Sequence, residues 1–231
     1  MLPVKSPTML LISCIYADAS LLVYNKPAGL LSVPGRGADK QDSLSSRVQA
    51  TPIFADARVV HRLDMATSGL MLMARGLDMQ RKLGALFEKC TIAKQYTALV
   101  HGCVGSSVSV LHTELATGWG LIDLPLAADW PNRPRQRVDM VSGKPSQTRW
   151  TLQSYNLMDD SSRVLLEPLT GRTHQLRLHM QASGHPVLGD TLYAPQAVVA
   201  KAPRLMLHAS RLAFTHPSTG EALVFESQAD F

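Results

Sequence analysis

The order of strand-like and helix-like segments constrains the fold of this chain more than any other feature of its sequence. Most apolar stretches are short and end at Gly, Pro, Asn or Asp, which is typical of β-strands. Strands are predicted over residues 10–16, 20–25, 58–63, 69–74, 92–100, 147–155 and 162–166, followed by a hairpin that turns at Thr219-Gly220. These strands do not alternate regularly with helices, and this favours an α+β fold over a doubly wound parallel sheet.

Helical spacing of apolar residues is confined to a few segments. Helices are predicted over residues 43–48, 78–90 and 173–183. Asp42-Ser43 can cap the first helix and Gly184 can close the last one. Residues 104–146 are polar and rich in proline, and no element is assigned to them.

Composition limits the class of protein further. The 231 residues are 45% hydrophobic and 18% charged, which excludes a disordered chain or a coiled coil and allows a sizeable core without disulfides. No repeat or linker marks a boundary, so residues 1–231 are predicted to form a single domain. No apolar run approaches the ~20 residues that cross a bilayer, and no secretory signal is evident, so a cytoplasmic protein without membrane association is expected. Cys14, Cys90 and Cys103 are predicted to be reduced and mostly buried.

The charge balance favours an anionic partner. Lys and Arg number 23 against 18 Asp and Glu, a net charge of +5 with a pI of about 9.3. Five cations and one acid, Asp139, gather within residues 133–149; the cations are Arg133, Arg135, Arg137, Lys144 and Arg149. On charge alone, a solvated loop and an RNA-contacting loop explain this segment equally well.

A charged turn between two apolar strands, residues 60–70, stands out as a candidate site. Its core reads His61-Arg62-Leu63-Asp64, with Thr67-Ser68-Gly69 three residues further on. The common alternatives find no support, because the chain has neither the G-x-G-x-x-G nor the G-x-x-x-x-G-K phosphate loop and lacks the G-x-S-x-G motif of serine hydrolases.

This turn resembles the H-R-L-D-x-x-T-S-G signature of the RluA family of pseudouridine synthases. Three further segments resemble motifs of that family in the same order: Asn25-Lys26-Pro27-Ala28-Gly29-Leu30, Lys94-Gln95-Tyr96 and Thr170-Gly171-Arg172-Thr173-His174-Gln175-Leu176-Arg177. The resemblance runs from about Leu22 to the C-terminus. It implies a pseudouridine synthase catalytic fold, with a mixed and mainly antiparallel sheet flanked by helices and loops. It also implies an isomerase that acts on RNA without a metal or an organic cofactor.

The resemblance also implies roles for individual residues. Asp64 is the expected catalytic carboxylate, Arg177 its ion-pair partner, and Tyr96 the residue that packs against the target uracil. Arg62 resembles the residue that enters the space left by the flipped base. Independently of the family, an active carboxylate must be ionised, and an arginine within ~4 to 6 Å lowers the pKa of a carboxyl group that burial would raise.

Further residues are expected to bind the RNA substrate, namely His61, Arg133, Arg135 and Arg172. Residues 129–134 and Gly143-Lys144-Pro145 are similar to the branch of the family that modifies both 23S ribosomal RNA and transfer RNA. A hairpin loop of 23S rRNA and the tRNA anticodon arm are therefore the expected substrates. Only about twenty residues precede the first motif, so no additional N-terminal RNA-binding module is expected, and a monomer is predicted.

Two other functions stay open at this level. One is a non-catalytic RNA-binding or folding factor on the same scaffold. The other is a metal-dependent hydrolase that uses His61, Asp64 and His174. The second has less support, because His174 and His179 are five residues apart and do not share a helix face as ligands at i and i+4 do. These histidines are predicted to be hydrogen-bonded instead.

Overall fold

One large β-sheet carries the fold in the computed structural model, which describes residues 12–105, 112–114 and 118–231. Its strands are β1 (Ser13–Ala17), β2 (Leu21–Lys26), β3 (Ala57–Val59), β4 (Ser68–Arg75), β5 (Ala93–His101), β6 (His112–Glu114), β7 (Gly120–Asp123), β10 (Gln147–Asn156), β11 (Ser161–Pro168), β12 (Leu207–Thr215) and β13 (Ala222–Glu226). They follow the order β1-β2-β4-β12-β5-β11-β10-β7-β6, and β3 and β13 pair with β4 and β12. All pairs are antiparallel except β4 with β12. The structure thus confirms a mixed, mainly antiparallel α+β fold.

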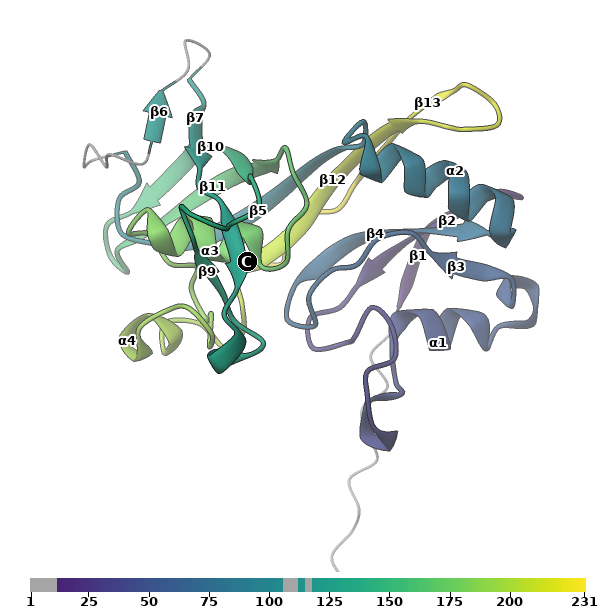
Figure 1. Ribbon diagram of the computed structural model, residues 1–231, viewed down its shortest axis with the longest axis horizontal. Helices are drawn as coiled ribbons and strands as arrows, with labels where there is room; N and C mark the ends of the chain where they lie inside the picture. Colours follow the sequence, from purple (N-terminus) through teal and green to yellow (C-terminus); the bar gives the residue numbers. More distant parts are fainter. Residues whose placement is uncertain (1–11, 106–111, 115–117) are drawn as a thin grey trace, which may run out of the picture.

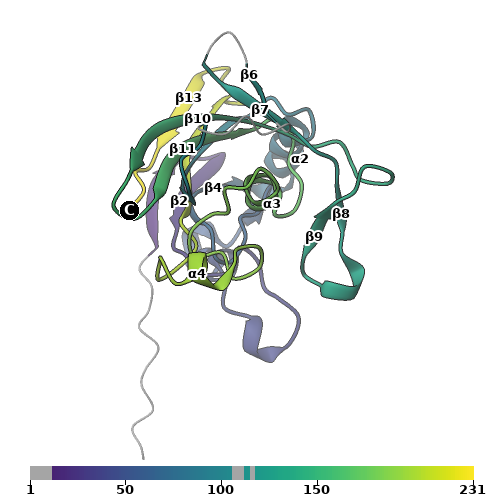
Figure 2. The same cartoon turned by 90° about the vertical axis from the view of Figure 1, so that its left-hand side faces the viewer.

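The helices lie in two groups on this sheet. They are α1 (Leu44–Gln49), α2 (Gly76–Glu88), α3 (Gln175–Ala182) and α4 (Gln196–Val199), with the 3-10 turns η1 (Ala38–Lys40), η2 (Pro52–Phe54) and η3 (Trp130–Asn132). Figure 1 shows α1 and α2 beside β1 to β4, and α3 beside β10 and β11 with α4 below it, with β5 and β12 running between the two groups. A separate pair of strands, β8 (Leu126–Ala128) and β9 (Gln136–Val138), forms a hairpin that stands away from the sheet (Figure 2).

Strand β4 is buried on both faces and anchors one helix on each. Leu70 and Leu72 pack with the α2 residue Leu83, whereas Met71 and Met73 point to the opposite face and pack in the cluster that contains α1. Helix α1 begins where Ser43 predicted it, since the Ser43 side chain accepts a hydrogen bond from the Ser46 amide at 3.1 Å.

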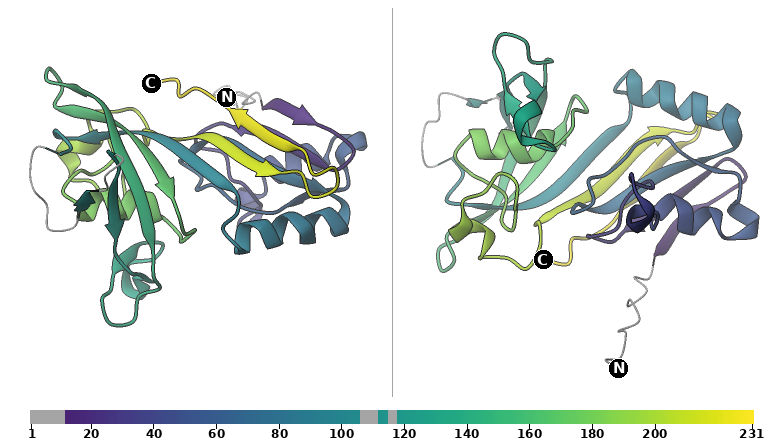
Figure 3. Two further views of the ribbon diagram at one scale, coloured as in Figure 1. Left: turned by 90° about the horizontal axis from the view of Figure 1, so that it is seen from above. Right: turned by 60° about the horizontal axis from the view of Figure 1, so that its bottom comes forward.

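A short parallel contact joins β4 to β12. Only Ser68 and Gly69 pair here, with His208 and Ala209. Gly69 has a φ of 113°, and a Cβ at this position would lie 2.4 Å from the Ala209 carbonyl oxygen. Glycine is therefore required for the approach of the two strands. The strands on either side of this contact are seen from two further directions in Figure 3.

Several local predictions were wrong. The predicted strand 58–63 ends at Val59, because the Leu63 backbone is bound by the Ser32 side chain instead of a neighbouring strand. The last predicted helix begins at Gln175, because the preceding residue adopts a left-handed conformation. Cys14 and Cys90 are exposed, on the edge strand β1 and just beyond α2, and were predicted to be mostly buried.

Other predictions were incomplete. Residues 104–146, to which no element was assigned, contain β6, β7, the β8–β9 hairpin and η3 among the residues that the structure describes. The first predicted strand begins at Ser13, and residues 10 and 11 lie outside the described residues. The C-terminal hairpin was predicted correctly, with Gly220 in a left-handed conformation at its turn. Across the described part of the chain, no helix has the length and hydropathy that a membrane span requires.

Candidate active site

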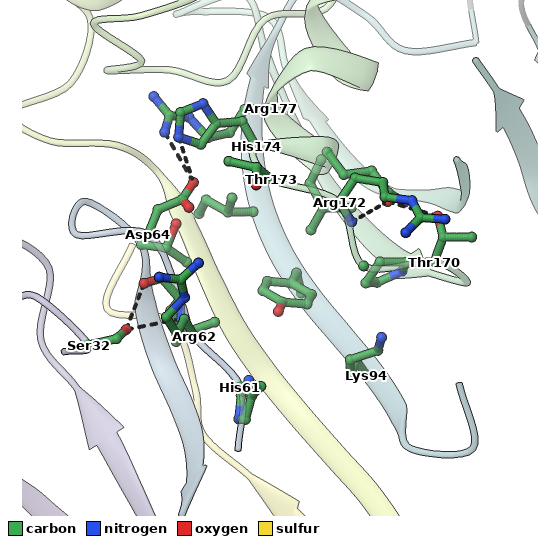
Figure 4. Close-up of a pocket in the computed structure, with 18 of the residues that line it drawn as sticks. Ser32, His61, Arg62, Asp64, Lys94, Thr170, Arg172, Thr173, His174 and Arg177 are labelled. Atoms are coloured by element: carbon green, nitrogen blue, oxygen red, sulfur yellow. Dashed lines mark hydrogen bonds and ion pairs between the residues drawn. The ribbon is translucent and has the colours of Figure 1, made fainter. Parts of the chain in front are cut away.

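A cavity of about 710 Å³ opens beside Asp64. Its lining includes residues of, or directly next to, each of the four motifs that resemble the pseudouridine synthase family. Its walls come from the loop after β2, the loop between β3 and β4, strand β5, and the segment from the end of β11 into α3. Figure 4 shows Asp64 facing Arg177 and His174 across this cavity, with Arg62 and Lys94 further along the walls. Residues more than 100 positions apart in sequence are thus brought together.

Asp64 lies in the loop between β3 and β4, and backbone contacts fix that loop on both sides of it. The Ser32 hydroxyl donates to the Leu63 carbonyl oxygen at 2.7 Å and accepts from the Leu63 amide at 3.0 Å. On the other side, the Lys26 ammonium donates to the Met65 carbonyl oxygen at 3.2 Å. Asp64 therefore sits on an ordered loop with little freedom to move.

Arg177 pairs with two carboxylates at once. Its Nη1 donates to Asp64 Oδ2 at 3.2 Å, whereas its Nε and Nη2 donate to the two oxygens of Asp190 at 2.8 and 2.6 Å. Burial by itself would lower the pKa of Arg177, but its hydrogen bonds and charge interaction with Asp190, assisted by Asp64, raise that pKa. Arg177 is consequently a fixed positive charge beside Asp64.

The second neighbour of Asp64 is His174. Its Nε2 lies 3.8 Å from Asp64 Oδ2, and its Nδ1 lies 2.7 Å from the Tyr193 hydroxyl. Burial lowers the pKa of His174, and the charge of Asp64 only partly opposes that effect. The contacts of Asp64 with Arg177 and with His174 thus converge on Oδ2.

Tyr96 enters the cavity from β5. Its backbone pairs with Leu166 of β11 and Ala209 of β12, so the ring is held between central strands. Burial, followed by the negative charge of Asp64, raises the pKa of the Tyr96 hydroxyl. The phenol is therefore neutral at physiological pH and offers a flat apolar face with one hydroxyl. Lys94, two residues earlier on the same strand, also lines the cavity.

Lys26 is a fully buried cation behind the Asp64 loop. Its ammonium donates to three backbone carbonyl oxygens, those of Pro27, Leu30 and Met65. Burial lowers the pKa of Lys26 to about 8, and the charge of Asp64 raises it slightly against that trend. Lys26 thus connects the loop after β2 to the loop that carries Asp64.

The remaining predicted residues fall into two groups. Arg62 and Arg172 are exposed and line the cavity. His61 also lines it, but its Nε2 accepts from the Leu72 amide at 2.9 Å and its ring stacks on Phe87. Arg133 and Arg135 lie on the β8–β9 hairpin and are exposed.

The basic segment is less uniform than its sequence indicated. Arg137 pairs with Asp139 at 2.9 Å and Arg149 pairs with Glu167 at 3.1 Å. Arg133, by contrast, stacks on the exposed ring of Trp130, with its guanidinium carbon 3.5 Å from the ring centroid. Two of the five cations are therefore already paired within the protein.

Metal ligands do not gather in the described part of the chain. Within residues 12–105, 112–114 and 118–231, no three His, Cys, Asp or Glu side chains are placed to hold one ion. His179 is buried between α3 and β10, where its ring nitrogens bond Thr148 and the Leu124 carbonyl oxygen, as a hydrogen-bonded histidine was predicted to do.

Comparison with known proteins identifies the family. The sequence model described as RNA pseudouridylate synthase matches residues 20–182, a stretch that contains Asp64, Tyr96 and Arg177. This chain belongs to the RNA pseudouridylate synthase family. Pseudouridylate synthases are isomerases, so the enzyme class and the family predicted from the motifs are both confirmed.

Relatives match almost the whole chain. The chain is 46% identical over 217 residues to the dual-specificity RNA pseudouridine synthase RluA of Escherichia coli strain K12, covering 94% of this chain and 93% of the relative. The RluA of Yersinia pestis is also 46% identical, over 94% of this chain and 98% of its own length. Human RNA pseudouridylate synthase domain containing 1 has a similar structure, with a TM-score of 0.76 and 26% identity over 97% of this chain and 86% of that one.

Within this pseudouridylate synthase site, the sequence analysis did not identify Asp190 and Tyr193, and it predicted His174 as a hydrogen-bonded histidine without a role beside Asp64. The sequence offers one signal for Asp190, namely the glycine before it. Gly189 has a φ of 72°, and a Cβ there would overlap the Arg204 carbonyl oxygen. A glycine that tight packing demands, followed by an acid, marks a turn that tertiary contacts hold in place.

Proposed function

We propose that this chain converts a uridine to pseudouridine in a hairpin loop of 23S rRNA and in the anticodon arm of tRNA, with Asp64 as the catalytic carboxylate. The observation that carries the proposal is the arrangement of charges around Asp64. It shares one guanidinium with a fully buried second carboxylate, and it opens onto a cavity large enough for a nucleoside. The printed names of the bacterial relatives, which describe dual-specificity RNA pseudouridine synthases, support the substrate assignment.

The reaction suits a single carboxylate. The N1–C1′ bond of uridine breaks and a C5–C1′ bond forms. C5 loses a proton and N1 gains one, so no oxidant and no second substrate are needed. Arg177 supplies a positively charged partner to the Asp64 carboxylate, with its Nη1 3.2 Å from Oδ2. In this proposal the other oxygen, Oδ1, approaches the nucleoside.

The walls of the cavity fit the other proposed roles. Tyr96 packs against the uracil face, and its neutral hydroxyl can take part in proton transfer from C5. A uridine inside a folded RNA must leave its stack, at a cost of a few kcal/mol, and Arg62 enters the space it leaves. Arg62 is suited to that role because it is exposed at the edge of the cavity.

The outer RNA contacts are assigned to the exposed cations. Arg133 and Arg135 on the hairpin and Arg172 beside the cavity contact phosphates, whereas His61 contributes to the cavity wall. We propose that residues 1–231 act as one catalytic domain, as a monomer in the cytoplasm. A non-catalytic RNA-binding factor is not favoured, because such a protein has no need to keep a carboxylate and its guanidinium partner in an open cavity.

The decisive experiment is to incubate the purified protein with unmodified tRNA and with 23S rRNA fragments, and then to map pseudouridine by carbodiimide-dependent primer-extension stops. Stops in the anticodon arm and in one rRNA hairpin loop are expected. Stops in only one of the two RNAs would restrict the proposed specificity, and stops in neither would overturn it. The Asp64→Asn protein serves as the matched negative control.

A further inference from the structure

Tyr193 connects the β8–β9 hairpin with both side chains that contact Asp64. Its hydroxyl accepts a hydrogen bond from the Gln136 amide at 2.8 Å and lies 2.7 Å from His174 Nδ1. Its buried ring lies 5.3 Å from the guanidinium carbon of Arg177 and 5.5 Å from that of Arg135. One side chain thus contacts the hairpin and both partners of the catalytic carboxylate.

The contacts of His174 favour one position for its proton. The Tyr193 hydroxyl accepts from the Gln136 amide, and it can donate its single proton to His174 Nδ1. A neutral imidazole that accepts at Nδ1 carries its proton on Nε2. Nε2 lies 3.8 Å from Asp64 Oδ2, which is outside hydrogen-bond distance but places an Nε2–H beside the carboxylate. Both ends of the ring therefore fit the tautomer with the proton on Nε2.

The backbone conformation of His174 supports the placement of its ring beside Asp64. It precedes α3 with a φ of 54°, in the left-handed region that a non-glycine residue rarely adopts. Its side chain does not cap the helix, although it occupies the N-cap position. The backbone instead directs the ring toward Asp64, and the Tyr193 hydroxyl holds the far edge of the ring.

We propose that Tyr193 is a positioning residue that sets the His174 Nε2–H and the Arg177 guanidinium against Asp64, and that it links this arrangement to the hairpin that contacts RNA. The expected effect on kcat rests on the proposed function, whereas the expected tautomer of His174 does not. Gln136 and Arg135 lie on the hairpin, so their contacts with Tyr193 connect the position of the hairpin to the surroundings of the carboxylate. Tyr193 therefore contributes to turnover after binding, and little to binding itself.

The first test replaces only the hydroxyl. In Tyr193→Phe the ring stays between the two arginines, so KM for the anticodon arm should change less than about twofold while kcat falls about tenfold, the loss expected for one orienting hydrogen bond. The His174→Gln protein should show a similar loss, and the double variant should lose no more than His174→Gln alone, because both changes break the same connection. Independent, multiplying losses, or an unchanged kcat in Tyr193→Phe, would overturn the proposal.

The second test does not depend on activity. In ¹⁵N-histidine-labelled wild-type protein, with His174→Gln used for assignment, His174 should give the signals of the neutral Nε2–H tautomer. Tyr193→Phe should shift those signals toward a mixture, whereas Tyr155→Phe, which removes an exposed hydroxyl bonded to Asp160, should not. Nδ1–H signals in the wild type would overturn the proposal even if Tyr193→Phe failed to fold. Wild-type protein that shows the expected tautomer but makes no pseudouridine would contradict the proposed function and support the placement of Tyr193.

Discussion

Two carboxylates share the guanidinium of Arg177, and their surroundings differ in almost every respect. The side chain of Asp190 is fully buried, accepts both a bidentate guanidinium and the amides of Leu192 and Tyr193, and lies in a tight turn after α3. The side chain of Asp64 is 29% exposed and receives a single guanidinium hydrogen bond on one oxygen.

The difference shows how one arginine can serve stability and reactivity together. Asp190 has used most of its capacity to accept hydrogen bonds, so it neutralises Arg177 and fixes its orientation. Asp64 accepts one hydrogen bond from the remaining guanidinium nitrogen, Nη1, on Oδ2. A bidentate pair at Asp64 would instead engage both oxygens of the carboxylate.

The largest effect is expected when Asp64, the more exposed of the two carboxylates, is replaced. Asp64→Asn removes the charge and keeps the shape, so kcat for tritium release from [5-³H]uridine-labelled tRNA should fall by about 10⁴-fold or more, as for other essential catalytic groups. The melting temperature should change little, because the Asp64 side chain is partly exposed and its hydrogen bond with Arg177 is a single one. Undiminished tritium release from the variant would remove Asp64 from the mechanism.

The next largest effect is expected on stability, when the buried carboxylate Asp190 is replaced. Asp190→Asn leaves Arg177 buried with one weak partner, so the free energy of unfolding, measured with urea, should fall by about 3 kcal/mol or more. Asp42→Asn is the matched control, since Asp42 pairs with Arg47 at an exposed position, and it should cost less than about 1 kcal/mol. Equal losses in the two variants would show that the Asp190 pair is no more important than a surface pair.

A third prediction concerns Lys26, the other buried cation near Asp64. Because its pKa is about 8 in the folded protein and 10.5 as an ordinary lysine, the unfolded chain binds more protons between those values. The unfolding free energy of the wild type minus that of Lys26→Met should therefore rise with pH from about 8 to 10.5, by no more than about 3 kcal/mol. A ¹³Cε titration of Lys26 with a midpoint near 10.5 would contradict the assignment.

The smallest effect is expected on RNA binding, when the exposed arginines of the β8–β9 hairpin are replaced. Removing Arg133 and Arg135 together should weaken RNA binding and lower the slope of log affinity against log salt by between about 1 and 2, since roughly one counterion is released per phosphate contact. The control is the double Ala variant of Arg81 and Lys89, two exposed cations in and just after α2 that do not line the cavity. An unchanged slope in the hairpin variant would exclude the hairpin from the RNA surface.

Much of the site was predictable because its residues lie in local motifs with a fixed relation to strong elements. Helix α2 follows from apolar spacing, and β4 from a continuous apolar run. Once the motifs around Asp64, Tyr96 and Arg177 are recognised, the ion pair between Asp64 and Arg177 follows, and the structure places those atoms 3.2 Å apart.

The residues that could not be predicted depend on tertiary contacts. Asp190 lies in a turn without periodicity, and only the fold brings it beneath Arg177. His174 adopts its left-handed backbone against local preference, so a helix that included it was the natural prediction. The strands of the β8–β9 hairpin have three residues each, too few for an alternating pattern to stand out in a proline-rich segment.

The contact between Asp64 and Arg177 spans 113 positions of the chain. During synthesis, the carboxylate therefore leaves the ribosome long before the arginine that pairs with it. Until then the nascent polypeptide carries an acid without this counterion, and the arrangement of charges around Asp64 forms only when the segment that carries Arg177 and Asp190 has docked.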